Sequence, residues 1–149
     1  DNIQFGDNNF NVDEGEKDDG EIDEKEVKII DMAEKDLINL KKTVYLNIVG
    51  SLNFDECCHK LLKLNLKEGQ ELEVIGVILE ANMQSHIYEK YFSSIAERLC
   101  LVSSIYKEGF ESQFKIQFIK LYNYETKKII NLAYLYSHLL SSKAIELSV

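Results

Sequence analysis

The sequence of 149 residues contains no proline and no tryptophan, and only seven glycines and three cysteines. Without proline, no residue removes a backbone donor from a helix, and the abundant Leu, Ile, Lys and Glu favour helical structure. The cysteines have no CxxC spacing, so we expect neither a disulfide framework nor a zinc site, and a reducing compartment is the default. No apolar run approaches the ~18 residues that a membrane span needs, so we expect no membrane partner.

The negative charge is concentrated at one end of the chain. The net charge is -9, and residues 1–26 hold eleven acids and two lysines, which account for all of it. This segment lacks helical periodicity and cannot bury enough apolar surface to offset the entropy of ordering. We predict that residues 1–26 form a disordered acidic linker, with a partner-binding tail as the alternative. Residues 27–149 carry 15 acids and 15 bases, and this balance argues against a general nucleic-acid-binding surface.

Apolar residues recur at helical spacing from Met32 onward, and the pattern predicts six helices. Their stripes are Leu37, Leu40, Val44 and Ile48; Phe54, Cys57, Cys58, Leu61 and Leu62; Leu72, Ile75, Leu79 and Met83; Tyr88, Tyr91, Phe92, Ile95, Leu99 and Val102; Phe110, Phe114, Phe118 and Leu121; and Ile129, Leu132, Ala133, Tyr136, Leu139 and Leu140. No segment shows the two-residue alternation of a strand. The sequence therefore predicts an all-α domain over residues 27–149, built as a stack of antiparallel helix pairs resembling an α-solenoid. We expect the aromatic rows to be core.

The stretch SLNFDECCHKLL, residues 51–62, places two cysteines, a histidine and two acids close together. On a helix, Cys57 and Cys58 fall on the apolar arc, where a free thiol behaves as a small hydrophobe. Asn53 stands at the N-cap, and Glu56 occupies the N3 position of a capping box. The structural interpretation therefore accounts for this stretch without invoking a reactive cluster.

The neighbouring side chains also fit a solvent-facing first turn. Leu52 is predicted to pack on Cys57 as a hydrophobic staple. Asp55 with His59, and Glu56 with Lys60, are i, i+4 pairs on the outer face.

A metal site or a catalytic cysteine fits these residues less well. Adjacent Cys57, Cys58 and His59 cannot direct their side chains at one tetrahedral centre from a helix. A nucleophilic cysteine needs a nearby base and partial exposure, and His59 faces away from Cys57. His86 and His138 are isolated. We predict no catalytic residue, no metal ligand and no cofactor.

Three blocks carry a resemblance to a known family: TVYLNIVGSLNFDECCHKLLKL (residues 43–64), YEKYFSSIAERLC (88–100) and YETKKIINLAYLYSHLL (124–140). In this order they resemble the MA-3 domain of the nucampholin (Cwc-twenty-two) family of pre-mRNA-splicing factors. The resemblance implies an all-helical fold of stacked antiparallel pairs, preceded by an acidic linker. It also implies that the last helices of the domain are missing here, so we expect uncovered apolar surface near residues 139–149.

The resemblance further implies a non-catalytic scaffold domain of a spliceosome component, acting in the nucleus in pre-mRNA splicing and exon junction complex assembly. Its implied partners are spliceosomal proteins. The DEAD-box helicase of the exon junction complex would be bound through the full-length protein rather than this domain, and RNA would be contacted only within the assembly.

The candidate interaction surface is the polar face of the second helix, with a second group near the sixth. Its residues are Asn53, Asp55, Glu56, Lys60, Lys63, Lys127 and Lys128. The alternative is that these side chains only form solvent-exposed helix faces and bind no partner.

Two other functions stay open at this point. One is a translation regulator whose MA-3 module binds a DEAD-box helicase directly. Related domains use an acid at the turn before the second helix for this contact, and that position here is Asn53, followed by Asp55 and Glu56. The other is a small helical enzyme or metal protein, which rests on residues 51–62 alone.

Overall fold

The structure, a computed structural model, describes residues 15–148, with side chains from residue 24 onward. Within this range the chain forms helices and no β-strand: α1 (Gly15–Gly50), α2 (Phe54–Leu62), α3 (Glu71–Gln84), α4 (Lys90–Val102), α5 (Ser104–Lys120), the 3-10 turn η1 (Leu121–Asn123) and α6 (Thr126–Ser141). The predicted all-α class is confirmed. No helix of the described range is long and apolar enough to cross a membrane.

The chain divides into two units, Asp1–Asn39 and Leu40–Val149. The described part of the first unit consists of α1 up to Asn39. Residues 1–14 of the predicted disordered linker lie outside the described residues, whereas residues 15–26 are helical. Glu and Lys cost little helix propensity, and no proline stops the backbone ladder from extending. The second unit begins at Leu40, later than the predicted domain boundary at residue 27.

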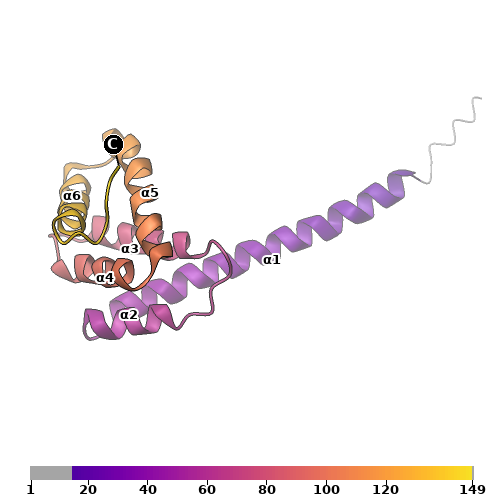
Figure 1. Cartoon of the computed structure of the whole chain (residues 1–149). Helices are drawn as coiled ribbons and strands as arrows, with labels where there is room; N and C mark the ends of the chain where they lie inside the picture. The colour runs from indigo at the N-terminus through magenta and orange to yellow at the C-terminus, as the bar shows by residue number, and fades with distance from the viewer. Residues whose placement is uncertain (1–14, 149) are drawn as a thin grey trace, which may run out of the picture. The chain divides into compact units, whose positions relative to one another are not determined.

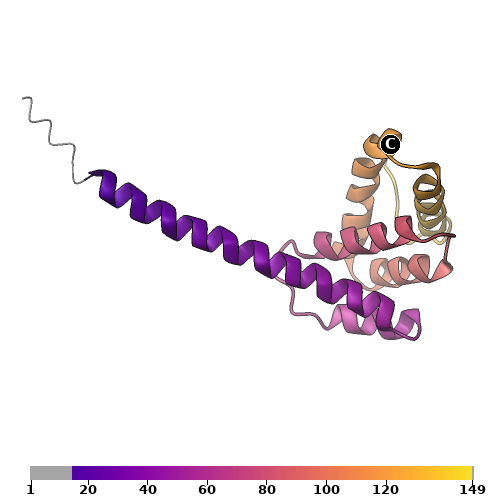
Figure 2. The same ribbon diagram turned by 180° about the vertical axis from the view of Figure 1, so that it is seen from behind.

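In the second unit, α4 packs on α2, α5 and α6, and α3 packs on α4, α5 and α6 (Figures 1 and 2). The side chains at the centre come from every helix of this unit and are fully or almost fully buried: Val44, Ile48, Cys57, Leu61, Ile75, Ile78, Leu79, Ile95, Leu99, Phe110, Leu135 and Leu139. Most of them belong to the predicted apolar stripes. Residues at the edges of these stripes lie outside the core, since Leu72, Val102 and Leu140 are exposed.

A pair of buried asparagines links α3 to α6. The side-chain amide of Asn82 donates to the carbonyl of Asn131 at 3.0 Å, and the amide of Asn131 donates to the carbonyls of Asn82 at 3.0 Å and Ser85 at 2.8 Å. Both residues are at most 2% exposed. Because buried polar groups cost free energy unless they are paired, these bonds fix the register of the two helices.

The end of the described chain folds back on the domain. Lys143 adopts a left-handed conformation with φ 62, and the amide of Ala144 donates to the carbonyl of Leu139 at 3.0 Å. This turn buries Ala144 and Ile145, and the Glu146 amide donates to a Glu111 carboxylate oxygen at 3.1 Å. The predicted uncovered surface near residues 139–149 is therefore wrong at these positions, because the left-handed turn directs the apolar side chains inward.

Candidate protein-interaction surface

The first turn of α2 is held by reciprocal hydrogen bonds, as the capping-box pattern predicts. Asn53 has extended backbone angles, and its Oδ1 accepts from the Glu56 amide at 2.9 Å. Glu56 Oε2 accepts in return from the Leu52 amide at 2.9 Å, one residue before the expected position. The predicted hydrophobic staple is wrong, since Leu52 is 92% exposed. It lies in the middle of the short connection from α1 to α2, where its side chain has no helix to pack on.

Asp55 connects α2 to α4. Its Oδ1 lies 2.9 Å from a guanidinium nitrogen of Arg98, so its partner is not His59, as the i, i+4 spacing predicts. The same guanidinium stands over the Phe54 ring at 5.4 Å from the centroid. A planar cation can satisfy both contacts at once, which a lysine cannot do as well. Because Arg98 is distant in sequence, helical spacing alone could not find this pair.

The remaining polar residues of α2 fall on its outer face. Lys60 Nζ lies 2.9 Å from Glu56 Oε1, so this predicted pair is confirmed. The hydrogen bond from Lys60 and the one from the Leu52 amide hold the pKa of Glu56 below its ordinary value. Lys63 is exposed at the end of the helix. Asn53, Asp55 and Glu56 thus hold the helix in place, while Lys60 and Lys63 extend the surface.

Lys127 and Lys128 belong to a different part of the domain. They occupy the first turn of α6, which contains no acidic residue, and both are half-buried. Since α6 packs on α3 and α4 whereas α2 packs on α4, the structure does not join these lysines to the α2 group. Lys128 instead lines a hollow of ≈ 230 Å³ together with the acid Glu80, Gln117 and Tyr124. Two cations at a helix N-terminus oppose the helix dipole.

The thiols have the properties of core residues. Cys57 and Cys58 are at most 2% exposed, and Cys58 Sγ donates to the Ile95 carbonyl at 3.6 Å. Burial raises the pKa of the Cys57 thiol and raises that of Cys58 to about 12. No group of three or more His, Cys, Asp or Glu side chains in the described residues could hold a metal ion. The interpretation of both cysteines as inward-facing hydrophobes is confirmed.

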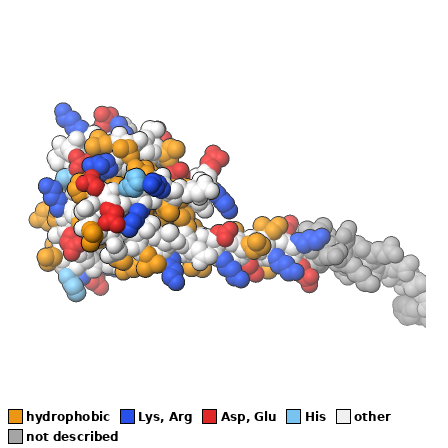
Figure 3. Space-filling model, turned by 90° about the horizontal axis from the view of Figure 1, so that it is seen from below, with side chains coloured by type: hydrophobic (Ala, Val, Ile, Leu, Met, Phe, Trp, Pro, Cys, Tyr) orange, Lys and Arg blue, Asp and Glu red, His pale blue; other side chains and the backbone are white. Residues whose placement is uncertain are grey.

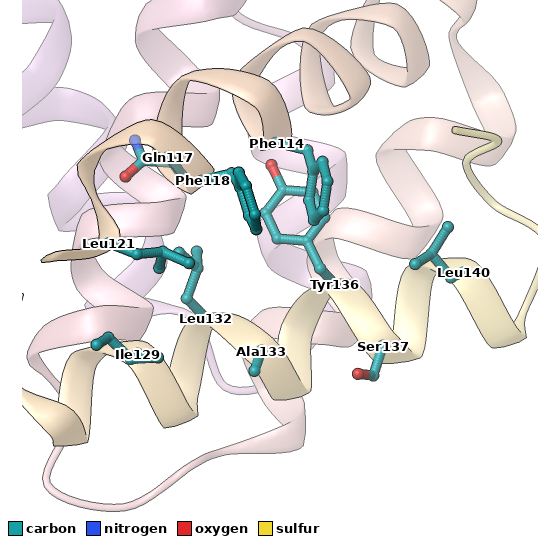
Figure 4. A pocket seen from close by; sticks show the side chains of 10 residues that line it. All are labelled: Phe114, Gln117, Phe118, Leu121, Ile129, Leu132, Ala133, Tyr136, Ser137 and Leu140. Atoms are coloured by element: carbon teal, nitrogen blue, oxygen red, sulfur yellow. The ribbon is translucent and has the colours of Figure 1, made fainter. Parts of the chain in front are cut away.

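A groove between α5 and α6 is a feature that the sequence reasoning missed (Figure 4). It has a volume of ≈ 270 Å³ and is lined by Phe114, Gln117, Phe118, Leu121, Ile129, Leu132, Ala133, Tyr136, Ser137 and Leu140. Phe114 packs edge-on against Tyr136 at 5.1 Å between ring centroids, and Phe118 stacks beside Phe114 at 6.2 Å.

The aromatic row of α5 was the signal for this groove. We expected the whole row to be core, and Phe110 is fully buried. Phe114 is half-buried, and Phe118 is 65% exposed, so the expectation is wrong at the end of the row. The row extends beyond the elements that cover α5, and its last aromatic ring, that of Phe118, borders the groove.

The comparisons with known proteins agree with this fold. A family model described as "MA3 domain" matches residues 40–146. The chain is 38% identical over 124 residues to "Pre-mRNA-splicing factor cwf22" of Schizosaccharomyces pombe. It is 40% identical over 125 residues to "Pre-mRNA-splicing factor CWC22 homolog" of Mus musculus, and 39% identical over 125 residues to that of Homo sapiens. These matches cover 83–84% of this chain and 14% of each relative.

Proposed function

Because the chain belongs to the MA3 domain family, we propose that it acts as a non-catalytic protein-interaction domain of a pre-mRNA-splicing factor. The observation that carries this proposal is the identity of 38–40% with proteins named as splicing factors. The matched stretch of 124 or 125 residues is most of the chain. The chain corresponds to only 14% of those relatives, so the activity of a whole protein is part of the proposal.

The physical character of the domain supports binding rather than catalysis. Its thiols are buried and held protonated, and its candidate surfaces consist of exposed charged and apolar side chains. On the face of the second unit seen in Figure 3, acidic and basic side chains lie interspersed among hydrophobic ones. Such a mixed surface suits protein partners, whereas a nucleic-acid surface needs a basic excess.

Within this function, the domain serves as a scaffold that holds spliceosomal proteins in the nucleus and contributes to exon junction complex assembly. Lys60 of α2, which is half-buried, and Lys63, the exposed C-cap residue of α2, are the residues of the predicted α2 surface that take no part in the N-terminal cap or the Arg98 contact. The DEAD-box helicase of the exon junction complex is bound elsewhere in the full-length protein, and RNA is contacted only within the assembly.

The proposal is tested by depleting the protein in its own organism and restoring either the wild type or a Lys60→Glu, Lys63→Glu variant. Retained introns, measured by RNA sequencing, should rise on depletion and return to normal with the wild-type protein. The variant should rescue less well than the wild type. An exposed control, Lys90→Glu, should rescue fully. Normal splicing after complete depletion would refute the proposed function.

A translation regulator that binds a DEAD-box helicase directly is the second candidate. Related domains place an acid at the position of Asn53, and in this chain the acids Asp55 and Glu56 follow that position within three residues, which keeps the candidate open. Titration calorimetry of the domain with the isolated helicase distinguishes the two functions. The regulator requires direct binding that weakens with Asp55→Asn, whereas the scaffold requires none at high micromolar concentration.

A further inference from the structure

Two hollows lie next to each other along the solvent-facing side of α3. The first, of ≈ 300 Å³, lies between α3 and the C-terminal part of α1. The second, of ≈ 230 Å³, lies between α3 and the residues of α5 and α6 that flank it on the other side. Glu80 and Gln84 of α3 line both hollows, so the two form one continuous groove, the α3 groove.

The floor of the α3 groove consists of small apolar residues. Gly76, Val77 and Ala81 line it and are half-buried. A Cβ atom added at Gly76 would meet no neighbouring side chain within 4 Å, so the floor is open there. Tyr45, which is 48% exposed, adds an aromatic ring on the α1 side. Ordinary ligand pockets measure ~300–1,000 Å³, so the groove suits inserted side chains better than a small molecule.

Two of the four charged residues that line the α3 groove are already engaged. Lys41 Nζ lies 3.6 Å from Glu73 Oε2. Glu80 Oε1 accepts a hydrogen bond from the side-chain amide of Gln84 at 3.2 Å. Because Gln84 is neutral, this bond leaves the Glu80 carboxylate at the centre of the groove without a cation beside it.

The other two charged residues are lysines on opposite sides of the groove. Lys42 lines it from α1, and Lys128 lines it from the first turn of α6. Neither lysine forms an ion pair within the described part of the chain. The lining therefore presents a cation at each edge and the carboxylate of Glu80 between them.

This order of charges selects the class of partner. Carboxylates at the two edges of a bound segment would complement Lys42 and Lys128, and a hydroxyl or amide donor at its centre would complement Glu80. The phosphate chain of an RNA would be repelled by Glu80 at the centre of the same groove. Residues 27–149 also carry 15 acids and 15 bases, without the basic excess that RNA binding needs. The groove is thus complementary to an acidic segment of a protein.

We propose that the α3 groove is the docking site for a segment of a partner protein that carries acidic side chains on both sides of a short apolar centre. The apolar centre rests on Gly76, Val77 and Ala81, and the acids face Lys42 and Lys128. The inference rests on the proposed function only for the assembly in which that partner is found.

Photo-crosslinking from the edge of the groove tests this inference in the native assembly. The photo-reactive amino acid p-benzoyl-phenylalanine replaces Tyr45, so that an aromatic ring is kept at this exposed position. The matched control replaces Tyr134, which is 55% exposed on α6 and does not line the groove. After irradiation, mass spectrometry identifies the crosslinked segment. We expect position 45, but not position 134, to capture a segment of another protein with an excess of Asp and Glu.

Substitutions at the groove add a quantitative check. The double variant Lys42→Glu, Lys128→Glu should lower the crosslink yield at position 45 by at least about tenfold, which corresponds to about 1.4 kcal/mol. Gly76→Glu places a carboxylate on the open floor and should lower the yield as well, although replacing a glycine inside α3 favours the helix. The control Lys90→Glu, exposed at the start of α4, should leave the yield unchanged. Circular dichroism verifies that each variant keeps its helix content.

A crosslink from position 45 to RNA, to a basic segment, to a second copy of the chain or to its own residues 1–26 would overturn the inference. The absence of any crosslink from this position in an intact assembly would overturn it too, and so would a yield that the two charge reversals leave unchanged. If the captured acidic segment belongs to a protein outside the splicing machinery, the docking inference stands and the proposed function fails.

Discussion

Replacing Arg98 by methionine removes the contact that ties the first turn of α2 to α4, and the cost divides into two parts. The ion pair with Asp55 is 2.9 Å long, but the side chains are 44% and 60% exposed, so solvent screens it. Exposed pairs of this kind contribute about 0.2–1 kcal/mol. The guanidinium over Phe54, at 5.4 Å, adds about 0.5–1 kcal/mol. Methionine retains the apolar stem, so we expect a total loss of about 1–2 kcal/mol.

A double-mutant cycle separates the two parts. Urea unfolding at 25 °C is measured for the wild type, Arg98→Met, Asp55→Asn and the double variant, and the coupling energy reports the ion pair. The remaining cost of Arg98→Met reports the contact with Phe54. In 1 M salt, where the Debye length is about 3 Å, the coupling should shrink while the Phe54 part persists. If Arg98→Met costs no more than Asp55→Asn, the reasoning about the shared guanidinium is refuted.

Four further measurements address the cap, the Glu56 carboxylate, the thiols and the buried amides. Asn53→Ala should cost about 1 kcal/mol in urea unfolding, and a cost near zero would show that the cap is not formed. The hydrogen bond from Lys60 lowers the pKa of Glu56 below its ordinary value of 4.5. The ionised carboxylate therefore stabilises the fold at pH values above 4.5, and this stabilisation is lost as the pH falls through the lowered pKa. The difference in unfolding free energy between the wild type and Glu56→Gln should be largest at pH 7 and should vanish in strong acid. Alkylation of Cys58 at pH 8 should be roughly a thousandfold slower in the folded than in the unfolded protein. This factor is the ratio of the thiolate fractions at pH 8 for pKa values of about 12 in the folded and about 8.5 in the unfolded protein. Comparable rates in the two states would contradict the burial of Cys58. Asn131→Leu should destabilise by about 1–3 kcal/mol because it removes the buried amide that donates to the carbonyls of Asn82 and Ser85, and a neutral effect would count against the asparagine pair.

The helices were predictable from sequence because their inner faces repeat at a period close to 3.6. Ile75, Ile95 and Leu139 were placed correctly on this basis, and the cap of α2 followed from the side chain of Asn53. The start of α5 was harder to place, since its capping residue Ser103 follows α4 without a loop. The spacing of apolar residues thus predicts a helix reliably where one face of that helix is buried along its full length.

Contacts between distant elements could not be read from such patterns. Asp55 has a local partner by spacing, but Arg98 on α4 lies closer to it in the fold and competes successfully. The exposure of Phe118 depends on where the elements that cover α5 end, which periodicity does not encode. For the same reason the groove was missed, although each of its aromatic residues had been placed on the correct helix.

The central claim is that this MA3 domain works within the splicing machinery. Its most direct test is purification of the protein tagged at its own locus, with quantification of the small nuclear RNAs and the proteins that accompany it. We expect spliceosomal small nuclear RNAs and splicing proteins to be enriched over an untagged control in nuclear extract. Enrichment of translation initiation factors in their place, with small nuclear RNAs at background level, would contradict the claim.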